Sequence, residues 1–222
     1  MSENSKEEIK SRNFSLRNIK ADKKFLLIGF VLIISIVSIT FATKDLFGTN
    51  FEDWTITQGS FEGTDGQLRA IGPNLNWAFH ESEVVYGEWV WSIRYFGSGS
   101  ASIIFIGLDQ DPNYSYHSQF GYKLEIEVNK DLSLKRLDGI ATETIIASTP
   151  AVFEAQTTYR FKVTRELNGN FTIFLDNEKQ FSGIDNTYTD SDVVELDWYN
   201  RHTINSVEAR DINGTATWVE YF

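Results

Sequence analysis

The chain has 222 residues, a formal net charge of −11 at pH 7 and no cysteine. The absence of cysteine excludes disulfides and a thiolate site, and the acidic balance argues against nucleic acid, whose phosphates are bound by Lys and Arg. The charge is unevenly distributed, because residues 1–24 carry a net +3 and the residues after 43 carry a net −14.

Residues 25–43 read FLLIGFVLIISIVSITFAT, nineteen residues without a charge. Because a helix rises about 1.5 Å per residue, a helix of this length covers most of a ~30 Å hydrocarbon core. Basic residues beside a first hydrophobic segment hold that flank in the cytoplasm. We therefore expect a single-pass protein of the cell membrane, anchored in lipid. Its parts are a cytoplasmic basic head (1–24), a transmembrane helix (25–43), a tether (44–50) and an extracellular domain (51–222).

Two other interpretations of this run stay open. The small residues Thr40 and Ala42 stand where a signal peptidase that cuts before Thr43 would need them, although the run is longer than the roughly 7–15 residues of a signal peptide core. The second interpretation is a prepilin-like processing signal, since Lys23 and Lys24 precede the run. It lacks the small residue before the cut and an early Glu in the run.

Hydrophobic residues alternate with polar ones along the rest of the chain. In residues 88–95, Trp89, Trp91, Ile93 and Tyr95 fall on one face, and residues 122–128 and 158–164 alternate in the same way. This period of two is typical of half-buried strands. Further strands are expected over 54–57, 67–71, 101–108, 132–137, 143–148, 171–176, 193–199 and 203–212. Short turns separate them, and no long amphipathic helix is expected beyond residue 43. The pattern predicts an all-β antiparallel sandwich.

An ordered series of motifs resembles a known family. It begins with FEDW (51–54), GSF (59–61) and DGQL (65–68), continues with FIG (105–107), GYKLEI (121–126), LKR (134–136), YRFKV (159–163) and NGNFTIFLD (168–176), and closes with the strand pair of 193–212. The series resembles concanavalin A-like, laminin G-like jelly-roll domains, in particular glucanase-like modules of microbial surface proteins. The resemblance implies two curved antiparallel sheets and, frequently, sugar binding. The family also includes enzymes and adhesion modules, so the fold does not decide the function.

The enzymatic alternative depends on carboxylates. Retaining glycosidases need two carboxyl groups about 5–5.5 Å apart, and laminarinase-type relatives carry them as Glu-x-Asp-x-(x)-Glu on one strand. The nearest match is Glu195 with Asp197, but Asn200 stands where a second glutamate would be needed. We interpret Glu195 and Asp197 as the solvent face of an amphipathic strand with Val194, Leu196 and Trp198 inward. No complete catalytic motif is found.

Calcium is the one cofactor that the sequence leaves possible. Asp109, Asp111 and Asn113 supply oxygen ligands at alternate positions of an expected loop, as Ca²⁺ prefers. An EF-hand would have Gly and Glu where Tyr114 and Phe120 stand, so a solvated turn is the favoured interpretation. The three histidines lack the spacing of a zinc site.

Three clusters of aromatic and polar residues are candidate ligand-binding sites, because sugars bind aromatic faces beside fixed hydrogen-bonding groups. They are Tyr114, Tyr116 and His117; Trp77 and His80; and Trp198 and Tyr199. The other possibility is that these rings close the ends of the sandwich. We expect a non-catalytic, membrane-anchored extracellular module that recognises carbohydrate or a surface protein. The alternatives are a glycoside-active enzyme and a structural subunit of a surface layer or filament.

Overall fold

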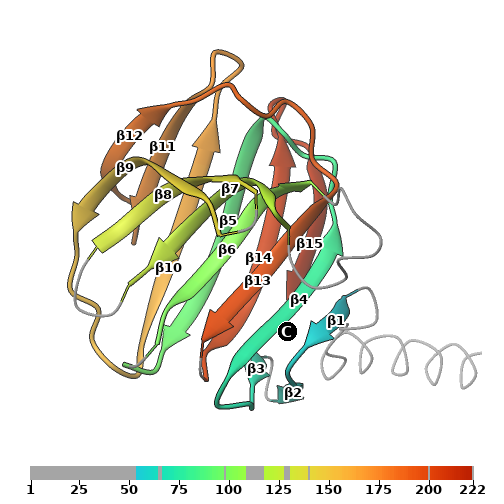
Figure 1. The fold of residues 1–222 in the computed structure, drawn as a ribbon, viewed down its shortest axis with the longest axis vertical. Coiled ribbons are helices and arrows are strands. Elements are labelled where there is room, and N and C mark those ends of the chain that lie inside the picture. The colour runs from blue at the N-terminus through green and yellow to red at the C-terminus, as the bar shows by residue number, and fades with distance from the viewer. Residues whose placement is uncertain are drawn as a thin grey trace, which may run out of the picture. The chain divides into compact units, whose positions relative to one another are not determined.

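The computed structural model describes residues 54–64, 67–97, 99–108, 118–127, 131–139, 141–199 and 201–221. The regular structure in these ranges consists of fifteen β-strands and no helix (Figure 1). Within these ranges, no helix has the length and hydrophobicity needed to cross a membrane. The hydrophobic run 25–43 lies outside the described residues, so its expected role as an anchor stays a prediction.

The strands form two sheets. Sheet A contains, in spatial order, β1 (Thr55–Gln58), β4 (Leu75–Glu81), β13 (Val193–Tyr199), β6 (Ala101–Leu108), β7 (Phe120–Ile126), β8 (Asp131–Asp138) and β9 (Glu143–Pro150). Sheet B contains β12 (Glu178–Ile184), β11 (Asn170–Leu175), β10 (Thr157–Arg165), β5 (Gly87–Tyr95), β14 (Thr203–Asp211), β3 (Gln67–Ala70) and β2 (Phe61–Thr64), with β15 (Ala216–Tyr221) also paired to β14.

Every pairing between these strands is antiparallel, and several join strands that are far apart in the sequence. The late strand β13 lies between β4 and β6 in sheet A, and the late strand β14 lies between β5 and β3 in sheet B. The predicted all-β antiparallel sandwich is therefore confirmed for the described residues.

The core lies between the two sheets and is rich in aromatic side chains. Strand β5 turns Trp89, Trp91, Ile93 and Tyr95 inward, and all four are almost fully buried, as their alternation predicts. On the neighbouring strand β10, Phe161 stacks on Trp91 with ring centroids 5.9 Å apart. Burial of such large apolar rings is the main stabilising contribution in a chain without disulfides.

Four strands were not expected from the sequence: β2, β4, β12 and β15. Strand β12 is an edge strand with mostly exposed side chains, so it has little hydrophobic alternation. Strand β2 has only four residues. Strand β4 has the sequence LNWAFHE, in which polar Asn76 is fully buried and accepts a hydrogen bond from the Ser60 N–H. Its buried and exposed positions therefore do not correspond to apolar and polar residues.

Candidate functional site

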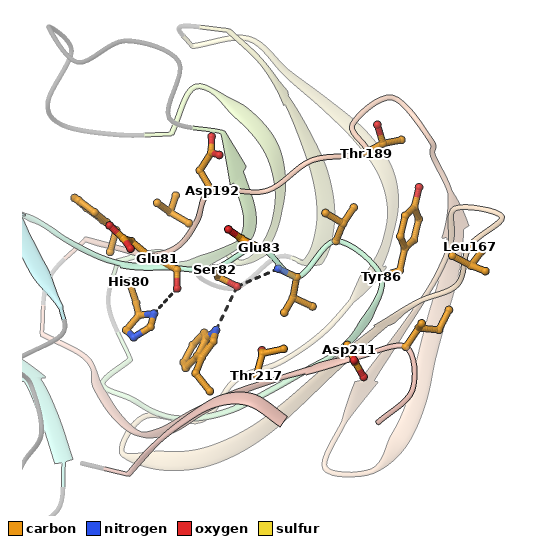
Figure 2. Close-up of a pocket in the computed structure, with 16 residues that line it drawn as sticks. His80, Glu81, Ser82, Glu83, Tyr86, Leu167, Thr189, Asp192, Asp211 and Thr217 are labelled. Atoms are coloured by element: carbon orange, nitrogen blue, oxygen red, sulfur yellow. Dashed lines mark hydrogen bonds between the residues drawn. The ribbon is translucent and has the colours of Figure 1, made fainter. Parts of the chain in front are cut away.

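A groove of about 1020 Å³ opens at the end of strand β4 (Figure 2). Four separate segments form it. They are residues 79–86, where the chain leaves sheet A for β5, residues 189–193 before β13, the hairpin between β14 and β15, and Leu167 in the turn between β10 and β11. The groove is therefore assembled by the fold from parts that are distant in the sequence.

The floor of the groove contains two stacked aromatic rings. The imidazole of His80 lies on the indole of Trp218 with centroids 4.6 Å apart and an interplanar angle of 24°. Buried Trp54 packs against both, at 5.6 Å from His80 and edge-on to Trp218 at 6.3 Å. The Trp218 indole N–H donates to Ser82 Oγ over 3.2 Å, and Ser82 Oγ also accepts the Val84 N–H at 3.5 Å. This indole therefore also fixes the loop that follows β4.

One wall is formed by Tyr86, behind which lies the buried arginine Arg165. Only 1% of Arg165 is exposed, and its Cζ lies 4.8 Å from the centroid of the Tyr86 ring. Its guanidinium donates to the carbonyl of Val85 at 3.3 Å and to the carbonyl of Tyr188 at 2.8 Å. Desolvation by burial lowers the pKa of Arg165. Arg165 therefore connects the 82–86 wall with the segment that leads to the 189–193 wall.

The remaining lining of the groove contains both apolar side chains, such as Val84 and Ile212, and polar ones. It includes the carboxylates of Glu81, Glu83, Asp192 and Asp211 and the hydroxyls of Ser82, Thr189 and Thr217, and no lysine or arginine is among the described residues that line it. Figure 2 labels these carboxylates and hydroxyls among the residues that line the groove. Aromatic rings beside fixed carboxylates and hydroxyls match what a polyhydroxylated ligand requires, since a sugar ring has both an apolar face and many hydroxyls.

A second polar surface lies on the outer face of sheet A. The Trp77 indole N–H donates to Asp197 Oδ1 over 2.8 Å, and Ser102 Oγ donates to Asp197 Oδ2 over 3.1 Å. These three residues are cross-strand neighbours on β4, β13 and β6. Both oxygens of the Asp197 carboxylate are therefore held within the sheet.

Next to Asp197, the carboxylate of Glu195 is buried, with only 3% exposed. It accepts the backbone N–H of Ser118 at 2.8 Å. Ser118 can approach because residue 107 is glycine, where a Cβ would lie 2.6 Å from Ser118 Oγ. The expectation that Glu195 belongs to an open solvent face is therefore wrong: β13 is an inner strand of sheet A, and Ser118 covers it.

Further along this face, two buried lysines form an ion-pair cluster. Lys123 pairs with Glu143 at 2.5 Å, and Lys135 pairs with Glu125, with Glu127 at 3.0 Å and with Glu143 at 3.2 Å. Burial alone would lower the pKa of Lys135, but its hydrogen bonds and attraction to these glutamates raise it above its usual value. Both buried lysines are paired with glutamates within the sheet, so we assign the cluster a structural role.

The structure separates the candidate residues predicted from the sequence. Trp77 lies on the outer face of sheet A and His80 in the groove, because residues three apart on a strand point to opposite faces. Trp198 is fully buried in the core, where it cannot meet a surface ligand, whereas its neighbour Tyr199 is 46% exposed. The other predicted residues lie outside the described residues: Tyr114, Tyr116 and His117, and the calcium candidates Asp109, Asp111 and Asn113. Among the residues that are described, no group of three His, Asp or Glu is arranged to hold a metal ion.

Sequence reasoning missed most of the groove. Ser82, Tyr86 and Trp218 gave no recognisable motif, because Ser82 and Tyr86 lie in the 79–86 segment, far in the sequence from Trp218 on β15, and only the fold brings the two parts together. Of the predicted candidates that the structure describes, only His80 lines the groove.

No family model and no curated protein matches this chain. Its fold, in contrast, is shared with solved β-sandwich domains. The carbohydrate-binding module CBM66 from Bacillus subtilis is similar with a TM-score of 0.59 and 13% identity, over 68% of this chain and 91% of that module. The carbohydrate recognition domain of Emp46p, in its potassium-bound form, has a TM-score of 0.55 and 15% identity, over 71% and 88%. A Bacillus subtilis protein of unknown function with a galectin-like fold has a TM-score of 0.54 and 13% identity, over 73% and 89%.

Proposed function

We propose that the domain is a carbohydrate-recognising module and that its ligand binds in the groove between β4, the 189–193 segment and the β14–β15 hairpin. The observation that carries this proposal is the aromatic floor of His80 and Trp218, held by a hydrogen bond to Ser82 and surrounded by carboxylates and hydroxyls. The volume of about 1020 Å³ suits a short oligosaccharide. Two of the proteins with a similar fold are a carbohydrate-binding module and a carbohydrate recognition domain, which adds support.

Within this proposal the rings and the polar groups have different roles. A half-buried ring such as Tyr86 offers an apolar surface to one face of a sugar, and the stacking of Arg165 behind it keeps the ring in place. Carboxylates such as Glu81 and Glu83 accept hydrogen bonds from sugar hydroxyls, and charged acceptors make such bonds stronger. Preformed walls lower the entropy cost of binding.

We propose binding without hydrolysis. Glu195 and Asp197 on β13 are the nearest match to a glycosidase motif, and both carboxylates are hydrogen-bonded to other residues of the domain. Glu195 accepts the Ser118 N–H, and Asp197 is held by Trp77 and Ser102. A general acid must be able to reach the glycosidic oxygen, and these contacts do not favour that role.

The test is a glycan array probed with the full chain, with and without millimolar Ca²⁺, followed by titration of the best oligosaccharide. Tyr86→Ala should reduce affinity at least tenfold, whereas Tyr199→Ala, an exposed tyrosine on the outer face of sheet A, should leave it unchanged. Absence of binding to any glycan would refute the proposal. A loss of affinity in Tyr199→Ala alone would move the site to sheet A.

We also propose that the module is displayed outside the cell by the hydrophobic run 25–43. The proposal is supported by the run's length and by the net +3 before it and −14 after it. Protease added to intact cells should remove the domain, and alkaline carbonate should leave the chain in the membrane fraction. Release by carbonate, together with a mature chain that starts at Thr43, would instead identify a cleaved signal peptide.

A further inference from the structure

Two arginines and a threonine form a row across three strands of sheet B, on the side away from the core. Thr203 on β14 is the cross-strand partner of Arg69 on β3 and of Arg94 on β5. The adjacent residues Leu68 and Ile93 point into the core. Successive side chains of a strand alternate between faces, so the row projects outward together. It shares no residue with the groove.

The two guanidinium groups of the row meet at one aromatic ring. The Cζ atoms of Arg69 and Arg94 lie 5.8 and 5.7 Å from the centroid of Phe96. The ring attracts both cations, but the two positive charges repel each other. Among the described residues, Arg69 forms an ion pair with Glu62 at 3.7 Å, in which the two side chains are 37% and 40% exposed. An exposed ion pair at this distance contributes only ~0–1 kcal/mol to stability. Arg94 makes no ion pair with any described residue.

Three hydrogen-bond donors of the row are buried and have no acceptor among the residues that the structure describes. They are Nε of Arg69, Nε of Arg94 and Oγ1 of Thr203, and Thr203 as a residue is only 2% exposed. Buried polar groups are nearly always hydrogen-bonded, and an unsatisfied one costs about 1–3 kcal/mol. Three such donors side by side, two of them on cations, call for an acceptor that is itself negatively charged.

We propose that Arg69, Thr203 and Arg94 bind an oxyanion, namely a sulfate or carboxylate group. Its oxygens accept the two Nε–H groups and the Thr203 hydroxyl, and its charge compensates the two guanidinium groups. Guanidinium donors suit oxyanions because they present N–H groups in a fixed plane. A net charge of −11 disfavours general anion adsorption, so saturable binding would come from these specific contacts. The oxyanion is either a free ion or a group carried by an acidic glycan.

The test follows the arginine Nε–H signals of the ¹⁵N-labelled full chain while sodium sulfate replaces sodium chloride at constant ionic strength. The proposal predicts saturable shifts of the Arg69 and Arg94 signals. Arg94→Gln should weaken sulfate binding at least tenfold, and Thr203→Val, which removes the hydroxyl at nearly constant shape, several-fold. Arg160→Gln is the matched control, since Arg160 lies exposed on the same face and bonds Asn177.

Shifts that rise linearly without saturation, or an equal effect of Arg160→Gln, would overturn the proposal and leave only water at the row. The titration of the unsubstituted chain decides this point even if a variant does not fold. A sulfated oligosaccharide and its unsulfated form then distinguish the two sources. Tighter binding of the sulfated form than of inorganic sulfate identifies a carried group, and equal binding identifies a free oxyanion.

Discussion

His80 and Trp218 lie stacked at 4.6 Å although one stands on β4 of sheet A and the other on β15, which pairs into sheet B. Their contact therefore joins the two sheets at the groove. Through the hydrogen bond from Trp218 to Ser82, it also holds the loop that leaves β4. The Trp218 indole therefore contributes both to the floor of the groove and to the position of this loop.

Trp218→Phe should weaken oligosaccharide binding several-fold, because the ring remains but the N–H donor to Ser82 is lost. Loss of this hydrogen bond should lower the free energy of unfolding by about 1 kcal/mol. Trp77→Phe is the matched control, since it removes an equivalent indole hydrogen bond, to Asp197, on the outer face of sheet A. Calorimetric titration that finds the same affinity loss in both variants would contradict the assignment of the groove.

Arg165→Lys should lower the free energy of unfolding by about 2–3 kcal/mol, because the amine keeps the charge but cannot serve carbonyls on two segments at once. Oligosaccharide affinity should fall as well, since the two walls lose their common anchor. Urea denaturation measures the first effect. The exposed Arg160→Lys should change stability by less than about 0.5 kcal/mol, and equal costs for the two variants would refute the anchoring role.

Stability should fall as the pH is lowered from 6.5 to 4, because of His202. Burial lowers the pKa of this fully buried imidazole to about 4, and the carbonyls of Tyr199 and Ser100 oppose the shift only in part. The unfolded chain thus binds a proton that the folded chain excludes, and the contribution of His202 is complete only above its unfolded pKa. About 3 kcal/mol should be lost by pH 4. His202→Phe should flatten the urea-derived stability curve over this window, and an unchanged slope would show that His202 is not responsible.

Gly121→Ala should be among the most destabilising single changes, with a cost of about 4 kcal/mol or more. Gly121 has a φ of +135°, and a Cβ there would lie 1.9 Å from the Ile106 carbonyl oxygen. Gly214→Ala is the control, because Gly214 also has a positive φ, +79°, but nothing lies within 4 Å. Its cost should be about 1 kcal/mol. Comparable thermal denaturation of the two variants would show that β7 can shift away from β6.

The sequence was sufficient for the fold class because strands such as β5 and β10 alternate between buried apolar side chains and more exposed polar ones, and β6 is a short apolar run bounded by turns. The alternation of Trp89, Trp91 and Ile93 predicts β5 almost to its ends, and residues 101–108 and 193–199 match β6 and β13 exactly as the structure has them. Edge strands such as β12 were missed because they bury little, so their hydrophobic period is weak.

The site was much less predictable. Period two indicates which residues share a face, but it does not tell which strands become neighbours. The contact of His80 with Trp218 depends on β15 folding beside β14 at the end of β4, and nothing in either segment indicates it. Glu195 illustrates the same limit, because its burial comes from Ser118 on another segment.

The most direct test of the central proposal is to locate a bound oligosaccharide by amide chemical-shift mapping on the full chain. The proposed site predicts saturable shifts concentrated in residues 82–86, 189–193 and 211–218. Shifts concentrated around Trp77, Asp197 and Tyr199, or none with any glycan, would contradict carbohydrate recognition by the groove.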